Sequence, residues 1–367
     1  MKISRRAFER YFFERFGEKA RRVSEFRSLG KGAHGEGYLF TVETDKGVKE
    51  YVLKTVRPEG LGHDYPADRA AMFLLAYDTF NALPGHVKAL DVISADGRSL
   101  KSISGGKEYF LLMEKAEGRN YFSDLESFSL KEALSEEDRK KISAMTDYLA
   151  RLHSKPPRGL PLSAKSLYAR KIRETVGHGE CLMGVFDTYP DGTLPLEEMV
   201  EIEQKAVLWR GRLKEKTYRL REVHGDFHPG NIWFERRGRC WKMRLLDRSR
   251  GPYGEPADDI TALGINFIFF SLMHFDDVRG PYLEALKTFF EEYIRKTGDR
   301  EVLGVCAPFL AFRGAVVANP VFYPELAPEK RRLIFNFMHN VLSSDTFRPE
   351  EVNIYLSSHN IHKGVLI

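Results

Sequence analysis

The chain lacks the residues that define several protein classes. Its 367 residues include three cysteines, Cys181, Cys240 and Cys306, and none of them forms a C-x-x-C pair. Such spacing argues against a disulfide framework or a zinc site and favours a reducing compartment. The longest apolar run, Gly264–Met273, is about half as long as a membrane span requires. The N-terminus has no continuous apolar stretch resembling a secretory signal. We therefore expect a cytoplasmic protein with no transmembrane segment.

Internal repeats and low-complexity tracts are also missing. With 43% hydrophobic and 30% charged residues, the composition is that of an ordinary globular protein. The length suffices for one large domain or for two lobes with separate cores. A basic isoelectric point suggests a nucleic-acid ligand, but no groove-reading motif accompanies it, so we expect no nucleic-acid partner.

Positive charge is concentrated at the N-terminus. Residues 1–30 contain nine Lys/Arg and four Asp/Glu, and aromatic residues alternate with the basic ones at roughly helical spacing. Two interpretations are open. The segment is either an amphipathic helix that contacts an anionic surface, or a helix that packs its aromatic face on the next lobe. Glu9, Glu14 and Glu18 dilute the positive face, which favours the packed helix.

The chain before residue 114 predicts a small, strand-rich lobe. Four stretches have the composition of strands, a turn joins the first two, and one segment predicts a helix. The strands are Tyr38–Glu43, Lys49–Val56, Val87–Ser94 and Glu108–Met113, the turn is Asp45–Gly47, and the helix is Ala67–Leu83.

After Gly118 most of the chain predicts helices, with three short strands. The helices are Ser135–His153, Leu196–Lys216, Asp259–His274, Tyr282–Thr297 and Lys330–Ser343, and the strands are Leu220–Val223, Ile232–Glu235 and Met243–Leu246. The Gly- and Pro-rich segment Pro156–Pro195 has weak periodicity and predicts an insertion or surface loops. The resulting domain prediction is a basic helix at 1–25, an N-lobe at 26–113, a hinge at 114–118 and a helical C-lobe at 119–367.

The segment His224–Asn231 (HGDFHPGN) is the most informative part of the sequence. It places an acid, Asp226, five residues before an amide, Asn231, in a loop that Pro229 and Gly230 prevent from becoming a helix. Phosphoryl transfer needs a carboxylate that meets the acceptor hydroxyl, as base or orienter, and an oxygen ligand that holds Mg²⁺ on the phosphates. The spacing therefore predicts this chemistry.

A glycine-rich loop precedes the first predicted strand. Gly30, Gly32 and Gly35 follow the pattern G-x-G-x-x-G, and a strand begins after the loop, whereas a dinucleotide-binding loop opens a helix. Such glycines let backbone amides approach phosphate oxygens, although a plain glycine-rich hairpin is the alternative. Lys54 follows on the next strand, where an ammonium group can bridge phosphates; a surface lysine is the alternative.

Asp247 ends an apolar strand, 21 residues after Asp226. The position resembles the I-D motif of kinase-like proteins, and this resemblance implies that Asp247 would bind the Mg²⁺ that bridges the phosphates; an ordinary strand-ending turn is the alternative. His224 and His228 suggest zinc at i,i+4 spacing, but that needs a continuous helix, which Pro229 prevents.

These motifs, in this order, resemble the aminoglycoside phosphotransferase and choline kinase superfamily of small-molecule kinases. The resemblance implies an α+β, bilobal protein-kinase-like fold with a small β-rich N-lobe and a larger helical C-lobe. It also implies roles for residues that the local pattern does not define. The Glu114 carbonyl and the Ala116 amide would face adenine, His224 and His228 would brace the loop, Asp259 (or Asp258) would cap the following helix and hold the loop, and Asp68 would replace the helix glutamate that pairs with Lys54.

The function implied is Mg²⁺-dependent transfer of the γ-phosphate of ATP (or GTP) to a hydroxyl group of a small molecule. A sugar, an amino alcohol or an aminoglycoside-like compound would serve as acceptor. Two alternatives stay open: a kinase for a protein or lipopolysaccharide-type acceptor, and a nucleotide-sensing scaffold with little turnover.

Overall fold

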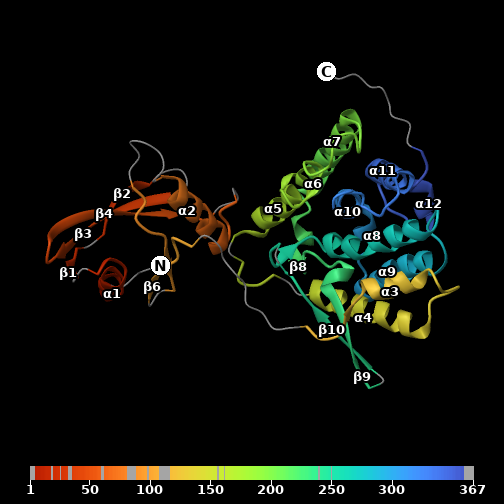
Figure 1. Ribbon diagram of the computed structural model, residues 1–367, viewed down its shortest axis with the longest axis horizontal. Helices are drawn as coiled ribbons and strands as arrows, with labels where there is room; N and C mark the ends of the chain where they lie inside the picture. Colours follow the sequence, from red (N-terminus) through yellow and green to blue (C-terminus); the bar gives the residue numbers. More distant parts are fainter. Residues whose placement is uncertain are drawn as a thin grey trace. The chain divides into compact units, whose positions relative to one another are not determined.

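The computed structural model describes most of the chain. The described residues are 5–17, 20–24, 26–31, 35–58, 62–80, 88–96, 99–106, 116–154, 157–160, 162–238, 240–248 and 250–358. They form a mixed α and β fold, as predicted, and the chain divides into two compact units, Met1–Met113 and Glu114–Ile367 (Figure 1). Three predicted features lie outside the described residues: Gly32, the strand Glu108–Met113 and Glu114.

The first unit is built on an antiparallel sheet in which β3 is central. Its strands are β1 (Ala20–Val23), β2 (Arg27–Lys31), β3 (Gly35–Thr44) and β4 (Gly47–Val56). β4 pairs with the full length of β3, whereas β2 and β1 pair with the first and second halves of its other edge. The predicted strands of the β3–β4 hairpin and the turn at Asp45–Lys46 are confirmed.

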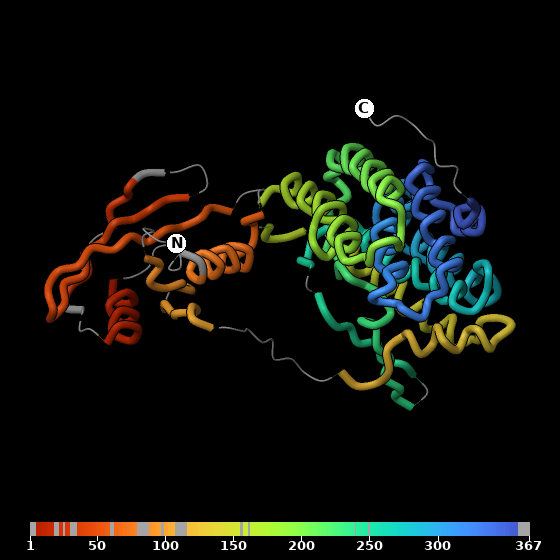
Figure 2. Tube along the Cα trace, turned by 45° about the horizontal axis from the view of Figure 1, so that its top comes forward, coloured from red at the N-terminus to blue at the C-terminus, as the bar shows by residue number. Residues whose placement is uncertain are grey.

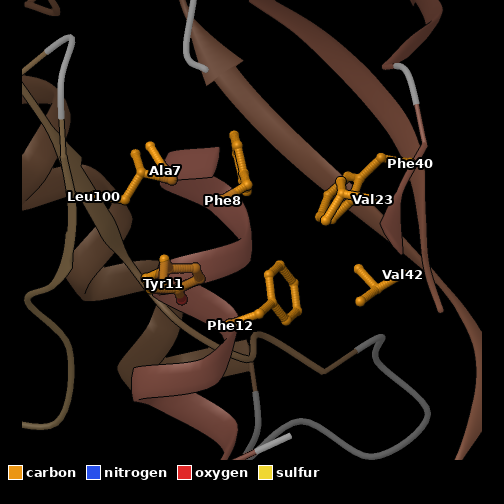
Figure 3. Packing of buried hydrophobic residues seen from close by; sticks show 8 residues of the cluster. All are labelled: Ala7, Phe8, Tyr11, Phe12, Val23, Phe40, Val42 and Leu100. Carbon is orange, nitrogen blue, oxygen red and sulfur yellow. The ribbon is translucent and has the colours of Figure 1, made fainter. Parts of the chain in front are cut away.

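The helix α1 (Arg5–Phe16) packs its aromatic face on this sheet. Phe8 and Phe12 are buried, and the centres of their rings lie 5.6 Å and 5.9 Å from the ring of Phe40 in β3. Figure 3 shows both side chains pointing toward the apolar residues of the strands. The aromatic side of the basic N-terminal segment therefore belongs to the core of the first unit.

Three short elements complete the first unit. They are α2 (Pro66–Phe80), β5 (Ile93–Ala95) and β6 (Leu100–Ser102). Asp91 accepts hydrogen bonds from Tyr11 and Arg15, which fixes α1 to the β5–β6 hairpin. The strand predicted at Val87–Ser94 begins only at β5, because the Asp91 side chain takes the backbone amide of Val92 and replaces strand pairing there.

The second unit is built around a helix that is buried on all sides. Its long helices are α4 (Glu136–His153), α8 (Pro256–His274), α9 (Gly280–Thr297), α10 (Ala307–Val317) and α11 (Pro328–Leu342). Every residue of α8 from Pro256 to Leu272 is buried; most of them are apolar, and the acidic pair Asp258 and Asp259 lies in the first turn. α9 and α10 pack on α8, α4 packs on α9, and α11 packs on α10 (Figure 1).

Between residues 156 and 195 the structure has helices where the sequence predicts loops. α5 (Ala164–Gly177) and α6 (Leu182–Phe186) pack together with α7 (Leu196–Leu213) (Figure 2). Leu167 and Ile172 of α5 are buried, so the segment contributes to the core. The alternative of surface loops is therefore wrong, since most of the Gly and Pro residues lie between these helices, whereas the alternative of an insertion stays a prediction.

Two small sheets flank the HGDFHPGN loop. The strands are β7 (Arg119–Asn120), β8 (Arg221–Glu222), β9 (Ile232–Arg237), β10 (Cys240–Leu245) and β11 (Tyr253–Gly254), and two further helices are α3 (Phe122–Phe128) and α12 (Val352–Tyr355). β9 pairs with β10 and β7, whereas β8 pairs with β11. No helix in the described part of the chain is long and apolar enough to cross a membrane.

Candidate functional site

The HGDFHPGN loop connects β8 to β9 and is braced by its own histidines. The Nδ1 atom of His224 accepts a hydrogen bond from the Asp226 amide at 3.3 Å, and that of His228 accepts one from the Gly230 amide at 3.2 Å. Gly225 adopts φ +88°, a left-handed conformation that favours glycine. Within the described residues, no group of three or more His, Cys, Asp or Glu side chains could hold a metal. The two rings are thus engaged with the loop backbone.

Asp259 lies beneath the loop and is fully buried. Its carboxylate accepts hydrogen bonds from the His224 and Gly225 amides, each at 2.7 Å, and the His153 Nε2 atom lies 3.1 Å away. Burial opposes ionisation, but the contact with His153 and these amides hold the pKa of Asp259 below its usual value. The resemblance implied that Asp259 caps α8, and this is wrong. The N-cap of α8 is Glu255, whose side chain accepts a hydrogen bond from the Ala257 amide.

Asp226 is held by a buried arginine of α10. The Nη1 atom of Arg313 donates to Asp226 Oδ1 at 2.6 Å, while Nη2 donates to Asp258 at 2.9 Å and to the Gly225 carbonyl at 3.3 Å. Burial would raise the pKa of Asp226, but Arg313 and Arg250 outweigh it and lower the pKa to about 2. Asp226 is therefore ionised at neutral pH. Its other oxygen, Oδ2, has no hydrogen bond within the described residues and lies 3.8 Å from His228 Nε2.

A cavity of about 230 Å³ opens beside Asp226, within the second unit. α8 and α10, which pack side by side, supply most of its wall (Figure 1). The lining residues are Asp226, His228, Arg250, Ala262, Ile265, Asn266, Arg313, Val316, Val317 and Tyr323. Burial lowers the pKa of His228, and the two arginines add to the effect although Asp226 opposes it, so the ring is mainly neutral at pH 7. A small molecule in this cavity would meet the ionised Asp226.

Asn231 and Asp247 are brought together by the β9–β10 hairpin. The Leu246 amide donates to the Asn231 carbonyl at 3.0 Å, so Asp247 directly follows the residue that pairs with Asn231. The Asn231 Nδ2 atom donates to the Asp226 carbonyl at 3.0 Å, which leaves Oδ1 as the atom suited to a metal. Asp247 is exposed and adopts φ +51°, and Asp is among the residues that tolerate this region. The two oxygen donors fit Mg²⁺, which takes further ligands from phosphates and water.

The glycine loop of the first unit is bounded by strands, as predicted. Gly30 pairs with Gly37 across β2 and β3, so the loop joins two strands and opens no helix. A Cβ atom at Gly35 would lie 1.9 Å from the Thr55 carbonyl oxygen of β4, so glycine is required there. Lys54 lies opposite Gly37 in the β3–β4 register and is exposed.

Lys54 and Asp68, which are both described, do not form the predicted ion pair. The Asp68 carboxylate accepts the Tyr65 amide at 2.8 Å at the start of α2, as a capping group does. Ala116 is half-buried at the start of the second unit. Its contact with adenine stays a prediction, as does the bridging of phosphate oxygens by Lys54.

Comparison with known proteins matches most of these motifs to one family. Residues 25–241 match the phosphotransferase enzyme family, APH. The chain belongs to this family. The resemblance to the aminoglycoside phosphotransferase and choline kinase superfamily is thereby confirmed. No curated protein matches the chain.

Solved structures similar to this phosphotransferase include three kinases of small molecules. An ethanolamine kinase of Plasmodium vivax is 12% identical, with a TM-score of 0.33, over 90% of this chain and 80% of its own. A microcompartment-associated aminopropanol kinase is 14% identical, with a TM-score of 0.41, over 89% and 94%. An aminoglycoside phosphotransferase of Streptomyces rimosus is 15% identical, with a TM-score of 0.35, over 90% and 99%. Because these identities and TM-scores are low, the acceptor of this phosphotransferase has to be inferred from its own residues.

The residues at the cavity of the phosphotransferase that were not predicted from the sequence include Arg250, Arg313 and Tyr323. A signal was present for Arg313, because it is the single charged residue in the apolar helix α10. An isolated charge in such a helix is buried and needs a partner. Arg250 follows Asp247 by three residues, so the end of the β10 strand already placed it near the site.

Proposed function

We propose that this phosphotransferase transfers the γ-phosphate of ATP (or GTP) to the hydroxyl group of a small alcohol, with Mg²⁺ on the phosphates. One observation carries the proposal. The carboxylate of Asp226 is held through Oδ1 by Arg313, while Oδ2 has no hydrogen-bond partner among the described residues. The side chain also lines a cavity of about 230 Å³, below the roughly 300–1,000 Å³ of sites for drug-sized ligands.

We assign to Asp226 the role of orienting the hydroxyl group of the acceptor. A carboxylate with a pKa of about 2 is a weak base at neutral pH. Phosphoryl transfer passes through a loose transition state in which the hydroxyl proton need not leave early. Oδ2 would accept the hydrogen bond of the hydroxyl and aim its oxygen at phosphorus. The new P–O bond then forms as the bond to the ADP oxygen breaks, and the hydroxyl proton passes to an oxygen of the transferred phosphate and from there to water.

The nucleotide is assigned to the other motifs. Gly30, Gly32 and Gly35 would offer backbone amides to the phosphates, and Lys54 would bridge their oxygens. Asn231 and Asp247 would hold the Mg²⁺, which neutralises charge that develops on the phosphates. We assign nucleotide binding to residues 26–113, adenine contacts of Glu114 and Ala116 to the hinge at 114–118, and the acceptor site to residues 119–367.

The decisive experiment is an assay of ADP release with Mg·ATP and Mg·GTP across hydroxylated small molecules. We expect at least one compound to stimulate release in the wild type. The Asp226→Asn variant should lose roughly 10²-fold or more in turnover and keep its affinity for the nucleotide. Near-normal turnover in this variant would refute the assignment. Tight nucleotide binding without stimulation by any compound would favour the scaffold alternative.

A further inference from the structure

Arg250 lines the cavity and forms no hydrogen bond with the described residues. Its side chain is 18% exposed, and its nearest acidic atoms are Glu180 Oε2, 3.5 Å from Nε, and Asp226 Oδ1, 3.9 Å from Nη2. Neither contact is a hydrogen bond, and the Nε and Nη1 atoms are buried with no hydrogen-bond partner among the described residues. Buried donors in proteins are almost always paired, so these three unused N–H groups at a cavity call for a ligand or water.

The other charges around the cavity are already paired. Arg313 bonds both Asp226 and Asp258, and Lys171 forms a second ion pair with Asp258 at 2.5 Å. These two cations and two carboxylates balance. Arg250 is a third cation at the cavity wall, and its two ion-pair contacts are the long ones to Asp226 and to Glu180, whose side chain is 62% exposed.

Packing keeps the Arg250 guanidinium at the cavity. Its central carbon lies 5.2 Å from the centre of the Phe312 ring, within the range of a cation–π contact. The group is thus held by a ring on one side and lines the cavity on the other. A planar guanidinium fixed in this way matches the two oxygens of a carboxylate or a phosphate.

We propose that the acceptor of this enzyme carries an anionic group, a carboxylate or a phosphate ester, that binds Arg250 while its hydroxyl binds Asp226. The inference rests on the proposed function, because it names the class of alcohol that the same site takes. Arg250 Nη2 and Asp226 Oδ1 are 3.9 Å apart. Because the guanidinium and the carboxylate are this close, a hydroxyl and an anion bound to them would lie near each other in a short acceptor. The apolar wall from α8 and α10 suits such a short skeleton.

Calorimetry with compounds that share one skeleton tests the charge preference. Glycerate, glycerol phosphate, glycerol and aminopropanediol are titrated into the protein saturated with Mg·ADP, together with hydroxy acids of four to six carbons. We expect one anionic compound or more to bind at least about tenfold more tightly than its neutral or cationic counterpart. Equal affinities, a preference for the amine, or no binding by any anion would overturn the proposal. The phosphate and carboxylate compounds distinguish the two anions.

The Arg250→Gln variant tests whether Arg250 is the residue that binds the anion. The tightest anionic compound should lose about tenfold to a hundredfold in affinity, approaching its neutral counterpart. Arg212→Gln removes one exposed positive charge from the same unit, outside the cavity, and should bind the anion as the wild type does. Unchanged anion affinity in Arg250→Gln, with lower turnover, would instead place Arg250 on the transferred phosphate and overturn the proposal.

Failure of the proposed function would look different. In that case a hydroxy acid or phosphate ester binds in an Arg250-dependent manner, but no phosphate is transferred to it or to any other alcohol. Transfer to neutral or cationic alcohols alone would keep the proposed function and reject the anionic acceptor.

Discussion

Arg313 Nη1 lies 2.6 Å from Asp226 Oδ1, so a cation of α10 fixes the carboxylate of a loop 87 residues earlier in the chain. The pair is buried, and Arg313 also bonds Asp258 at the start of α8. One guanidinium therefore joins the loop, α8 and α10. It lowers the pKa of Asp226 and leaves Oδ2 with no hydrogen-bond partner among the described residues.

Removing the guanidinium should destabilise the protein. Arg313→Met leaves two buried carboxylates without this partner, and breaking such a pair costs roughly 3–5 kcal/mol. We expect urea unfolding to show a loss of this size, and turnover to fall because Asp226 loses its orientation. Arg313→Lys keeps the positive charge but not the planar guanidinium, and it should lose less stability than Arg313→Met. The exposed Arg300 gives a control, Arg300→Met, and an equal loss in both methionine variants would contradict the role of the buried pair.

The stability of the protein should depend on Asp226 in acid. Its carboxylate titrates near pH 2 in the folded chain and near 3.8 when unfolded, so the unfolded state takes up the proton first as the pH falls. The stabilisation is complete above about pH 4 and is lost between pH 4 and pH 2, in total about 2 kcal/mol. Unfolding free energies measured at pH 6 and pH 3 should therefore differ less in Asp226→Asn.

Asp345→Asn is the matched control for this titration, because that carboxylate is 94% exposed. Its pH dependence should follow the wild type. Asp259 also has a lowered pKa, so Asp226→Asn should remove only part of the acid dependence. If the unfolding free energy changed with pH equally in the wild type and in Asp226→Asn, the ion pair with Arg313 would not stabilise the fold.

The parts of the site that the sequence predicts are those built from neighbouring residues. Asp226 and Asn231 are five residues apart, and the β9–β10 hairpin brings Asp247 beside Asn231 through a short turn. Arg313 and Arg250 reach Asp226 through the packing of the helical unit, which no local pattern encodes. The same reason explains why the sequence did not predict α5. Its apolar residues are buried by packing against α6 and α7, which are separate in the sequence.

Asp247 should control the affinity for Mg·ATP. Asp247→Asn keeps a residue that tolerates φ +51° but removes the charge, and we expect the affinity to fall about tenfold or more. Asp247→Ala should lose the ligand as well and add backbone strain of about 1 kcal/mol or more. Calorimetry with a non-hydrolysable ATP analogue, with and without Mg²⁺, measures the first effect. Asp277, whose side chain is 40% exposed, gives the control Asp277→Asn, and unchanged Mg²⁺ dependence in both would remove Asp247 from the metal site.

Two glycines of one strand give a matched test of the nucleotide loop. At Gly35 a Cβ atom would lie 1.9 Å from the Thr55 carbonyl oxygen, so Gly35→Ala must push β3 away from β4. At Gly37, two residues later, the nearest atom would be 3.8 Å away. We expect Gly35→Ala to destabilise the protein by roughly 1–3 kcal/mol and to weaken binding of the ATP analogue, because the loop is displaced from the phosphates.

Gly37→Ala should leave both quantities close to those of the wild type, since its new methyl group meets only ordinary contacts. Thermal unfolding and calorimetry on the two variants separate a close backbone approach from a general intolerance of side chains in the strand. Equal behaviour of the two variants would show that the approach of β4 to Gly35 does not shape the loop. A loss of stability in Gly35→Ala with intact nucleotide affinity would confine the role of this glycine to the sheet.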